Sequence, residues 1–90
     1  MENKIQALAN QSRIAALIAK HGMDNALKDG GWHGWRELGG AAPNNKHWKI
    51  CNMAAKAGLL EKRGAVVEGK YRKYNCVEYR AAGLLWGLLG

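Results

Sequence analysis

Glycine divides this sequence into short segments, which limits the length of any single helix or strand. Twelve of the 90 residues are glycine, about twice the usual share. Glycine favours turns and helix C-termini because it tolerates positive φ. We therefore place breaks at Gly22, Gly30–Gly31, Gly39–Gly40, Gly58 and Gly69. A chain of this length, divided in this way, predicts one small domain over residues 1–90 and excludes two.

Hydrophobic periodicity predicts helices between the breaks in the first part of the chain. Apolar residues recur at helical spacing over 4–20, and short helical turns follow at 23–27 and 34–38. A further helix is expected at about 44–57, with Asn44 or Asn45 as its N-cap and Gly58 as its stop. Two short helices joined by a glycine-containing turn, the second one basic, form a helix-turn-helix pattern.

The second part of the chain predicts a hairpin followed by a helix. Residues 59–67 and 70–77 favour strands, and Glu68-Gly69 between them is a turn signal. From residue 78 to 89 the apolar positions return at helical spacing, which predicts a C-terminal helix. The predicted fold class is therefore mainly α with a small β-hairpin (α+β).

Four short motifs in this order are shared with one known family. They are ALANQSRI at 7–14, REL at 36–38, AGLL at 57–60 and EGKY at 68–71. The chain resembles the ArsR-type bacterial repressors. The resemblance implies a winged helix-turn-helix: a three-helix core with a recognition helix at about 44–57, a wing at about 60–77 and a C-terminal helix at about 78–89. It also implies a homodimer made through the first and last helices.

The positive charge of the chain is concentrated in one region. The formal net charge is +7, and residues 46–73 hold eight of the 14 basic residues but two of the seven acidic ones. Such a block attracts polyanions, because each neutralised phosphate releases counterions. Double-stranded DNA is the predicted partner, and a basic face kept for solubility is the alternative.

The predicted DNA-contacting residues lie on the third helix and on the wing. Polar and cationic side chains of the recognition helix reach base edges or phosphates, and basic side chains of the wing meet the backbone. On the helix they are Asn45, Lys46, Trp48, Lys49, Asn52 and Lys56, and on the wing Arg63, Lys70, Arg72 and Lys73. Trp48 has two interpretations, an exposed stacking ring or a buried anchor of the core.

Other classes of function have less support in the sequence. The histidines and the two cysteines match no zinc-ligand spacing. No Cys-Val-Cys box stands at 34–38, where the metal-sensing repressors carry one, and no phosphate loop is visible. We expect no enzyme activity, no catalytic residues, no cofactor and no metal.

The predicted function is a small, sequence-specific transcriptional repressor in the cytoplasm. No apolar stretch is long enough to span a bilayer, so no membrane partner is expected. Two alternatives remain. One is a protein-protein interaction module on the same scaffold, such as a phage-encoded inhibitor or assembly factor, and the other is a nonspecific nucleic-acid binder.

Overall fold

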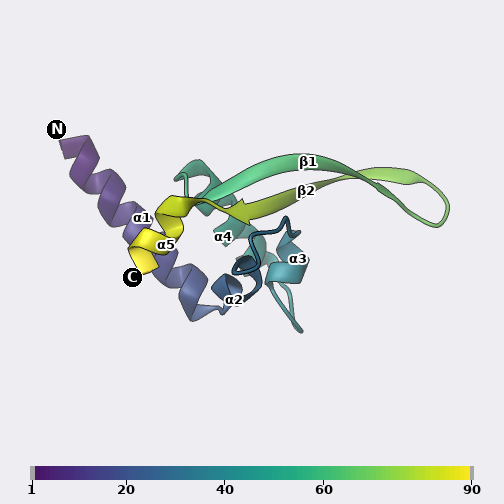
Figure 1. The fold of residues 1–90 in the computed structure, drawn as a ribbon, viewed down its shortest axis with the longest axis horizontal. Coiled ribbons are helices and arrows are strands. Elements are labelled where there is room, and N and C mark those ends of the chain that lie inside the picture. The colour runs from purple at the N-terminus through teal and green to yellow at the C-terminus, as the bar shows by residue number, and fades with distance from the viewer. Residues whose placement is uncertain (1, 90) are drawn as a thin grey trace.

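The computed structural model describes residues 2–89 as a small α+β domain of five helices and one antiparallel hairpin (Figure 1). The helices are α1 (Glu2–Lys20), α2 (Met23–Leu27), α3 (Trp35–Leu38), α4 (Asn45–Lys56) and α5 (Gly83–Leu89), and the strands are β1 (Leu60–Glu68) and β2 (Lys73–Ala81). The molecule measures 51 × 25 × 23 Å. The start of α1 and the tip of the hairpin lie at opposite ends of the long axis (Figure 1).

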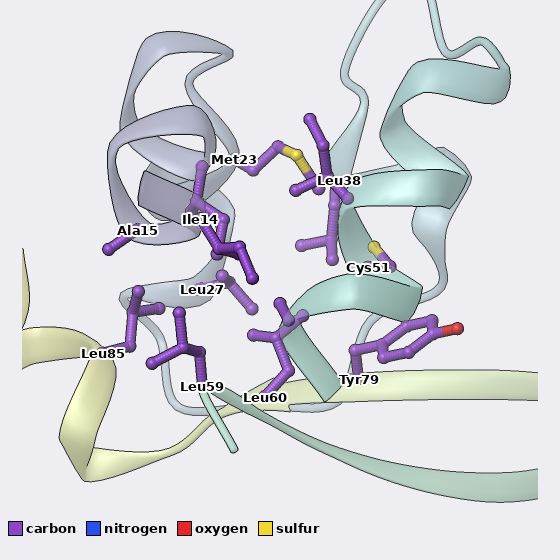
Figure 2. Close-up of a cluster of buried hydrophobic side chains, with 13 residues drawn as sticks. Ile14, Ala15, Met23, Leu27, Leu38, Cys51, Leu59, Leu60, Tyr79 and Leu85 are labelled. Carbon is purple, nitrogen blue, oxygen red and sulfur yellow. The ribbon is translucent and has the colours of Figure 1, made fainter. Parts of the chain in front are cut away.

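One hydrophobic cluster joins the helices to the base of the hairpin. It is built mainly from Ile14 and Ile18 of α1, Met23, Leu27, Leu38, Ile50 and Cys51, together with Leu59, Leu60, Tyr79 and Leu85. Figure 2 shows Tyr79 at the edge of this cluster, with its hydroxyl group pointing away from the aliphatic side chains. Because this core lies at one end of the hairpin, the distal half of the hairpin extends beyond the helices (Figure 1).

At both ends of helix α4, side chains form hydrogen bonds with backbone groups that have no partner within the helix. The Oδ1 atom of Asn44 accepts a hydrogen bond from the backbone N of Lys46 at 2.9 Å, and the backbone N of Asn44 donates to Nδ1 of His47 at 3.2 Å. At the other end, Nε2 of Gln11 donates to the carbonyl oxygen of Ala57 at 2.9 Å. Gly58 then takes a φ of 83°, which favours glycine and ends the helix. The observed helix agrees with the predicted range.

The turn between α3 and α4 is tight because residue 39 has no side chain. A Cβ atom at Gly39 would lie 2.8 Å from Cβ of Pro43 and 3.1 Å from Cγ of His47. No real Cβ atom tolerates the first of these distances, so the close approach of Pro43 requires glycine. The two helices are thereby held against each other as a pair.

The hairpin pairs β1 with β2 from Leu60↔Ala81 to Glu68↔Lys73. The short segment before α3 adds to its other edge, because His33 and Tyr79 exchange backbone hydrogen bonds of 2.8 and 2.7 Å. The sheet therefore has the spatial order His33, β2, β1. This agrees with the strand character expected for Trp32 and His33.

The predicted C-terminal helix at 78–89 is wrong in its first third. Residues 78–81 continue β2, and helix α5 begins at Gly83. Tyr79 was assigned to the helix because its spacing to Ala82 and Trp86 fits a helical face. In the structure its backbone N–H and C=O groups both bond to His33 and it stands opposite Lys62 in the hairpin, which a local pattern does not reveal. The hairpin is correspondingly longer than the predicted wing at 60–77.

Candidate nucleic-acid interface

Helix α4 turns one face into the core and a polar face outward. His47, Ile50, Cys51 and Ala54 are buried. On the opposite side lie Asn45, Lys49, Asn52 and Lys56, spaced at i, i+4, i+7 and i+11. This spacing places the four side chains in one row along the helix. We call this row the α4 stripe.

The other two predicted residues of α4 lie on either side of the stripe. Lys46 lines a shallow hollow of about 390 Å³ with Leu17 and His21, at the end of α1. Trp48 lies on the side of the hairpin and is 46% exposed. Of its two interpretations, the structure therefore supports the exposed ring.

The lysines of α4 have no acidic partner in the structure. In the part of the chain that the structure describes, the basic residues that form salt bridges are His33, Arg63, Lys73 and Arg80. The positive charge of Lys46, Lys49 and Lys56 is therefore available to an anion from outside the chain. Three of the 14 basic residues of the chain thus lie on α4.

A groove separates α4 from the hairpin and from the start of α3. Its volume is about 670 Å³. Its lining includes Trp48 and Asn52 of α4, Trp35 and Arg36 of α3, and Lys62 and Asn75 of the hairpin. We call it the α4–hairpin groove. It combines two indole rings, two amides and two cationic side chains in one hollow.

Asn52 of the stripe is tied to the hairpin. The hydroxyl of Tyr79 donates a hydrogen bond to Oδ1 of Asn52 at 3.3 Å. Asn52 is half-buried, whereas Asn45 and Lys49 are exposed. A bidentate contact with adenine needs both the oxygen and the NH₂ group of an amide. Asn45 and Lys49 are therefore stripe residues whose exposed side chains can contact an external partner without breaking this internal bond.

The structure separates Arg63 from the other predicted residues. Side chains alternate between the faces of a strand, so Arg63 and its partner Glu78 lie on the face opposite to Lys62 and Tyr79. Nη2 of Arg63 is 3.0 Å from Oε1 of Glu78, and its guanidinium lies 4.3 Å from the ring centre of Trp32. Arg63 is thus neutralised and points away from α4.

The remaining predicted residues lie around the hairpin tip. Lys70 and Arg72 occupy the connection between the strands, and Lys73 begins β2. Nζ of Lys73 is 3.6 Å from Oε1 of Glu68, and both side chains are largely exposed. The tip stands clear of the helices (Figure 1). The predicted cations therefore form two groups, on α4 and at the tip, and not one continuous patch.

Among the predicted contact residues, Trp48 and Asn52 line the α4–hairpin groove, and sequence reasoning missed the rest of its lining. Trp35, Arg36, Lys62 and Asn75 line it with Trp48. For Lys62 a signal was present, because it lies two residues after the buried Leu60 and so shares its face of the strand. The positions of Trp35 and Arg36 depend on the packing of α3 against α4 and β2, for which the sequence holds no local signal.

A second polar cluster lies around the start of α3. Nε2 of His33 is 2.8 Å from Oδ1 of Asp29, and its Nδ1 is 2.6 Å from Oε1 of Glu37. The hydrogen bond to Asp29 contributes most to raising the pKa of His33, and Glu37 adds to it against the effect of burial. The cluster ties the loop before α3 to α3 itself.

Residues 2–89 contain no group of three or more side chains suited to hold a metal ion. Burial raises the pKa of the Cys51 thiol to about 12, so this thiol stays protonated at neutral pH. None of the helices in the described range is long and apolar enough to cross a membrane. The chain matches no protein-family model, no curated protein and no solved structure.

Proposed function

We propose that this protein is a double-stranded DNA-binding protein with a winged helix-turn-helix fold, and that it acts as a small transcriptional repressor. The α4 stripe carries the proposal. It is a row of two amides and two exposed lysines, the lysines without acidic partners in the described chain, on the helix that follows a tight helix-helix turn.

The order of the elements supports the winged helix. Helix α1 is followed by the strand-like His33, then by α3, α4 and the hairpin, and the three extended segments pair in the order His33, β2, β1. In this arrangement α3 and α4 are the helix-turn-helix and the hairpin is the wing. The wing begins directly beside α4, since Leu59 donates a backbone hydrogen bond to Ala54.

The dimensions of the helix suit the DNA major groove. An α-helix with its side chains is about 10–12 Å wide and the major groove is about 12 Å wide. With the α4 stripe in the groove, Asn45 and Lys49 meet base edges, while Lys46 and Lys56 meet the phosphates that border them. The hairpin then extends along the duplex and brings Lys70 and Arg72 to the backbone.

A salt titration tests the binding mode. The four phosphate-contacting side chains named for each protomer predict that the logarithm of the binding constant falls with the logarithm of salt concentration with a slope of about −4 for each bound protomer. The measurement is fluorescence anisotropy with a labelled 20-base-pair duplex selected from a random pool. A shallow slope, or no binding to any duplex, contradicts the proposal.

Matched lysine variants test the role of α4. Lys49→Ala should weaken binding to the selected duplex by roughly tenfold to a hundredfold, because it removes a base contact. Lys28→Ala removes the same charge from the exposed end of α2 and should change affinity by less than threefold. If the two variants lose affinity equally, or if Lys49→Ala loses affinity equally on selected and random DNA, the protein is a nonspecific nucleic-acid binder and not a sequence-specific repressor.

We further propose that two copies pair through α1 and α5. Helix α5 packs on its own α1 through Leu85, yet Leu84 and Trp86 remain 43% and 37% exposed. The first half of α1 projects beyond this contact (Figure 1), with Ile5 75% and Leu8 54% exposed. Large exposed apolar side chains on neighbouring helices are typical of a protein interface. A two-fold dimer places two α4 helices about 34 Å apart on the duplex.

Sedimentation equilibrium tests this pairing. The wild-type protein should sediment as a dimer, and Leu8→Lys should sediment as a monomer with an unchanged circular dichroism spectrum. Leu8→Lys should also bind the selected duplex more weakly, because it loses half of the phosphate contacts. A wild-type monomer that binds DNA overturns the dimer, and a monomer that binds no DNA favours an interaction module that docks another protein on this face.

A further inference from the structure

We propose that the α4–hairpin groove accepts one unpaired nucleobase of the DNA bound by α4, so that the protein prefers a duplex with an extruded base over a fully paired one. This inference rests on the proposed DNA binding. It assigns a ligand to the α4–hairpin groove, which the proposed contacts between α4 and the DNA major groove leave empty.

The groove has the size and the walls for a single nucleotide. Its volume of about 670 Å³ lies within the range of ordinary ligand sites. Trp48 lines it from α4 and Trp35 from α3. The indole of Trp48 is 46% exposed, so its surface is accessible to an incoming ring. Aromatic side chains of this kind bind unstacked bases without regard to sequence, because every base has a flat π face.

The amide groups of the groove suit the polar edge of a base. The Tyr79 hydroxyl engages Oδ1 of Asn52 at 3.3 Å, which leaves the NH₂ group of Asn52 as the donor for a ligand. Asn75 contributes a second amide from β2. All four bases present acceptor atoms at their edges. The groove therefore favours a base over a purely apolar ligand, and no particular base is required.

The charges of the groove suit the phosphate that accompanies the base. Arg36 and Lys62 line it and take part in no salt bridge within residues 2–89. Glu78 also borders the groove, but its carboxylate is held at 3.0 Å by Arg63. The uncompensated charge at the groove is therefore positive. An anionic nucleotide fits it better than a neutral aromatic molecule does.

The position of the groove explains why the base must be unpaired. It opens beside Trp48 and Asn52, next to the α4 stripe that lies in the major groove in the proposed complex. A base inside the duplex cannot reach it without leaving the stack, and that step costs free energy. A base that is already unpaired avoids most of this cost. The stacking on Trp48 then appears as a gain in affinity.

The test compares two labelled duplexes of identical selected sequence, one fully paired and one carrying a single extra adenosine at the edge of the selected site. The extra base should tighten binding about tenfold. Trp48→Leu should remove this gain, whereas Trp32→Leu, the same change at a ring outside the groove that lies against Arg63 and Arg80, should keep it. Trp48→Phe retains a ring and should keep part of the gain.

A second measurement does not depend on the variants. With 2-aminopurine as the extra base, binding of the wild-type protein should quench its fluorescence, because the base stacks on an indole. Failure of both duplexes to bind overturns the proposed function itself. Tight binding of both duplexes with equal affinity and no quenching overturns the groove proposal alone. A gain that persists in Trp48→Leu places the extra base elsewhere and also overturns it.

Discussion

His33 is a nearly buried ionisable side chain that lies between two carboxylates. It is 8% exposed, and each of its ring nitrogens faces a carboxylate, Asp29 at 2.8 Å and Glu37 at 2.6 Å. Both carboxylates favour the protonated ring, so the pKa of His33 is raised. The hydrogen bond between His33 and Asp29, together with the one from the backbone N–H of Gly31, lowers the pKa of Asp29. The cluster holds the loop before α3 in place, next to the backbone pairing of His33 with Tyr79.

This cluster predicts a pH dependence of stability. The contribution of His33 is fully present below its unfolded pKa of about 6.5 and is lost as pH rises through its raised folded pKa. The contribution of Asp29 is present above its unfolded pKa and is lost as pH falls through its lowered folded pKa. Urea midpoints should therefore be highest at weakly acidic pH and fall towards pH 9. His33→Gln should flatten the fall on the alkaline side, and parallel curves for the two proteins would falsify this assignment.

At the scale of the element, α4 depends on local signals at its N-terminus. Asn44 supplies a side-chain oxygen to the backbone N of Lys46, and the ring of His47 accepts from the backbone N of Asn44. Both bonds form within four residues of the chain. This is why the sequence alone predicts where α4 begins. The orientation of the α4 stripe then follows from the buried face of His47 and Ile50.

The cap predicts different effects for two neighbouring asparagines. Asn44→Ala should lower the free energy of unfolding by about 0.5–2 kcal/mol, because it removes the acceptor for the first helical N–H groups. Asn45→Ala is the matched control, since Asn45 is exposed on the α4 stripe, and it should change stability by less than about 0.5 kcal/mol. Urea denaturation measures both. Equal losses would show that Asn44 does not act as the cap.

At the scale of the whole molecule, the cations are distributed along an elongated body. The strands of the hairpin have nine residues each, which corresponds to about 30 Å. The base of the hairpin lies against α4, and its tip stands clear of the helices (Figure 1). The lysines of α4 and the cations of the tip are therefore expected to meet phosphates about nine base pairs apart along a duplex.

This separation predicts that the tip contributes only on long DNA. On a 20-base-pair duplex, the double variant Lys70→Ala/Arg72→Ala should reduce the steepness of the salt dependence by about two. On a 10-base-pair duplex centred on the same selected site, the variant and the wild-type protein should have the same slope. The check is the salt titration repeated with both duplexes. A loss of the same size on the short duplex would mean that the tip folds back towards α4.

Features that arise from contacts between near neighbours in the chain could be predicted from the residues alone. The cap at Asn44, the stop at Gly58 and the turn at Gly69 are local, so the helix at 45–56 and the hairpin were predictable. The charge block at 46–73 was equally visible, because counting charges needs no geometry.

Which charges lie together depends on the three-dimensional packing of distant parts of the chain. Arg63 and Lys62 are adjacent in sequence, yet the register of the hairpin directs Arg63 to Glu78 and Trp32, and Lys62 to the α4–hairpin groove. Tyr79 joined β2 and not the last helix because His33, 46 residues earlier, pairs with its backbone. Contacts between distant residues therefore determine where Arg63 and Lys62 point and why Tyr79 lies in β2. The free energy of these contacts exceeds the local preference for a helix that the periodicity of residues 78–89 indicates.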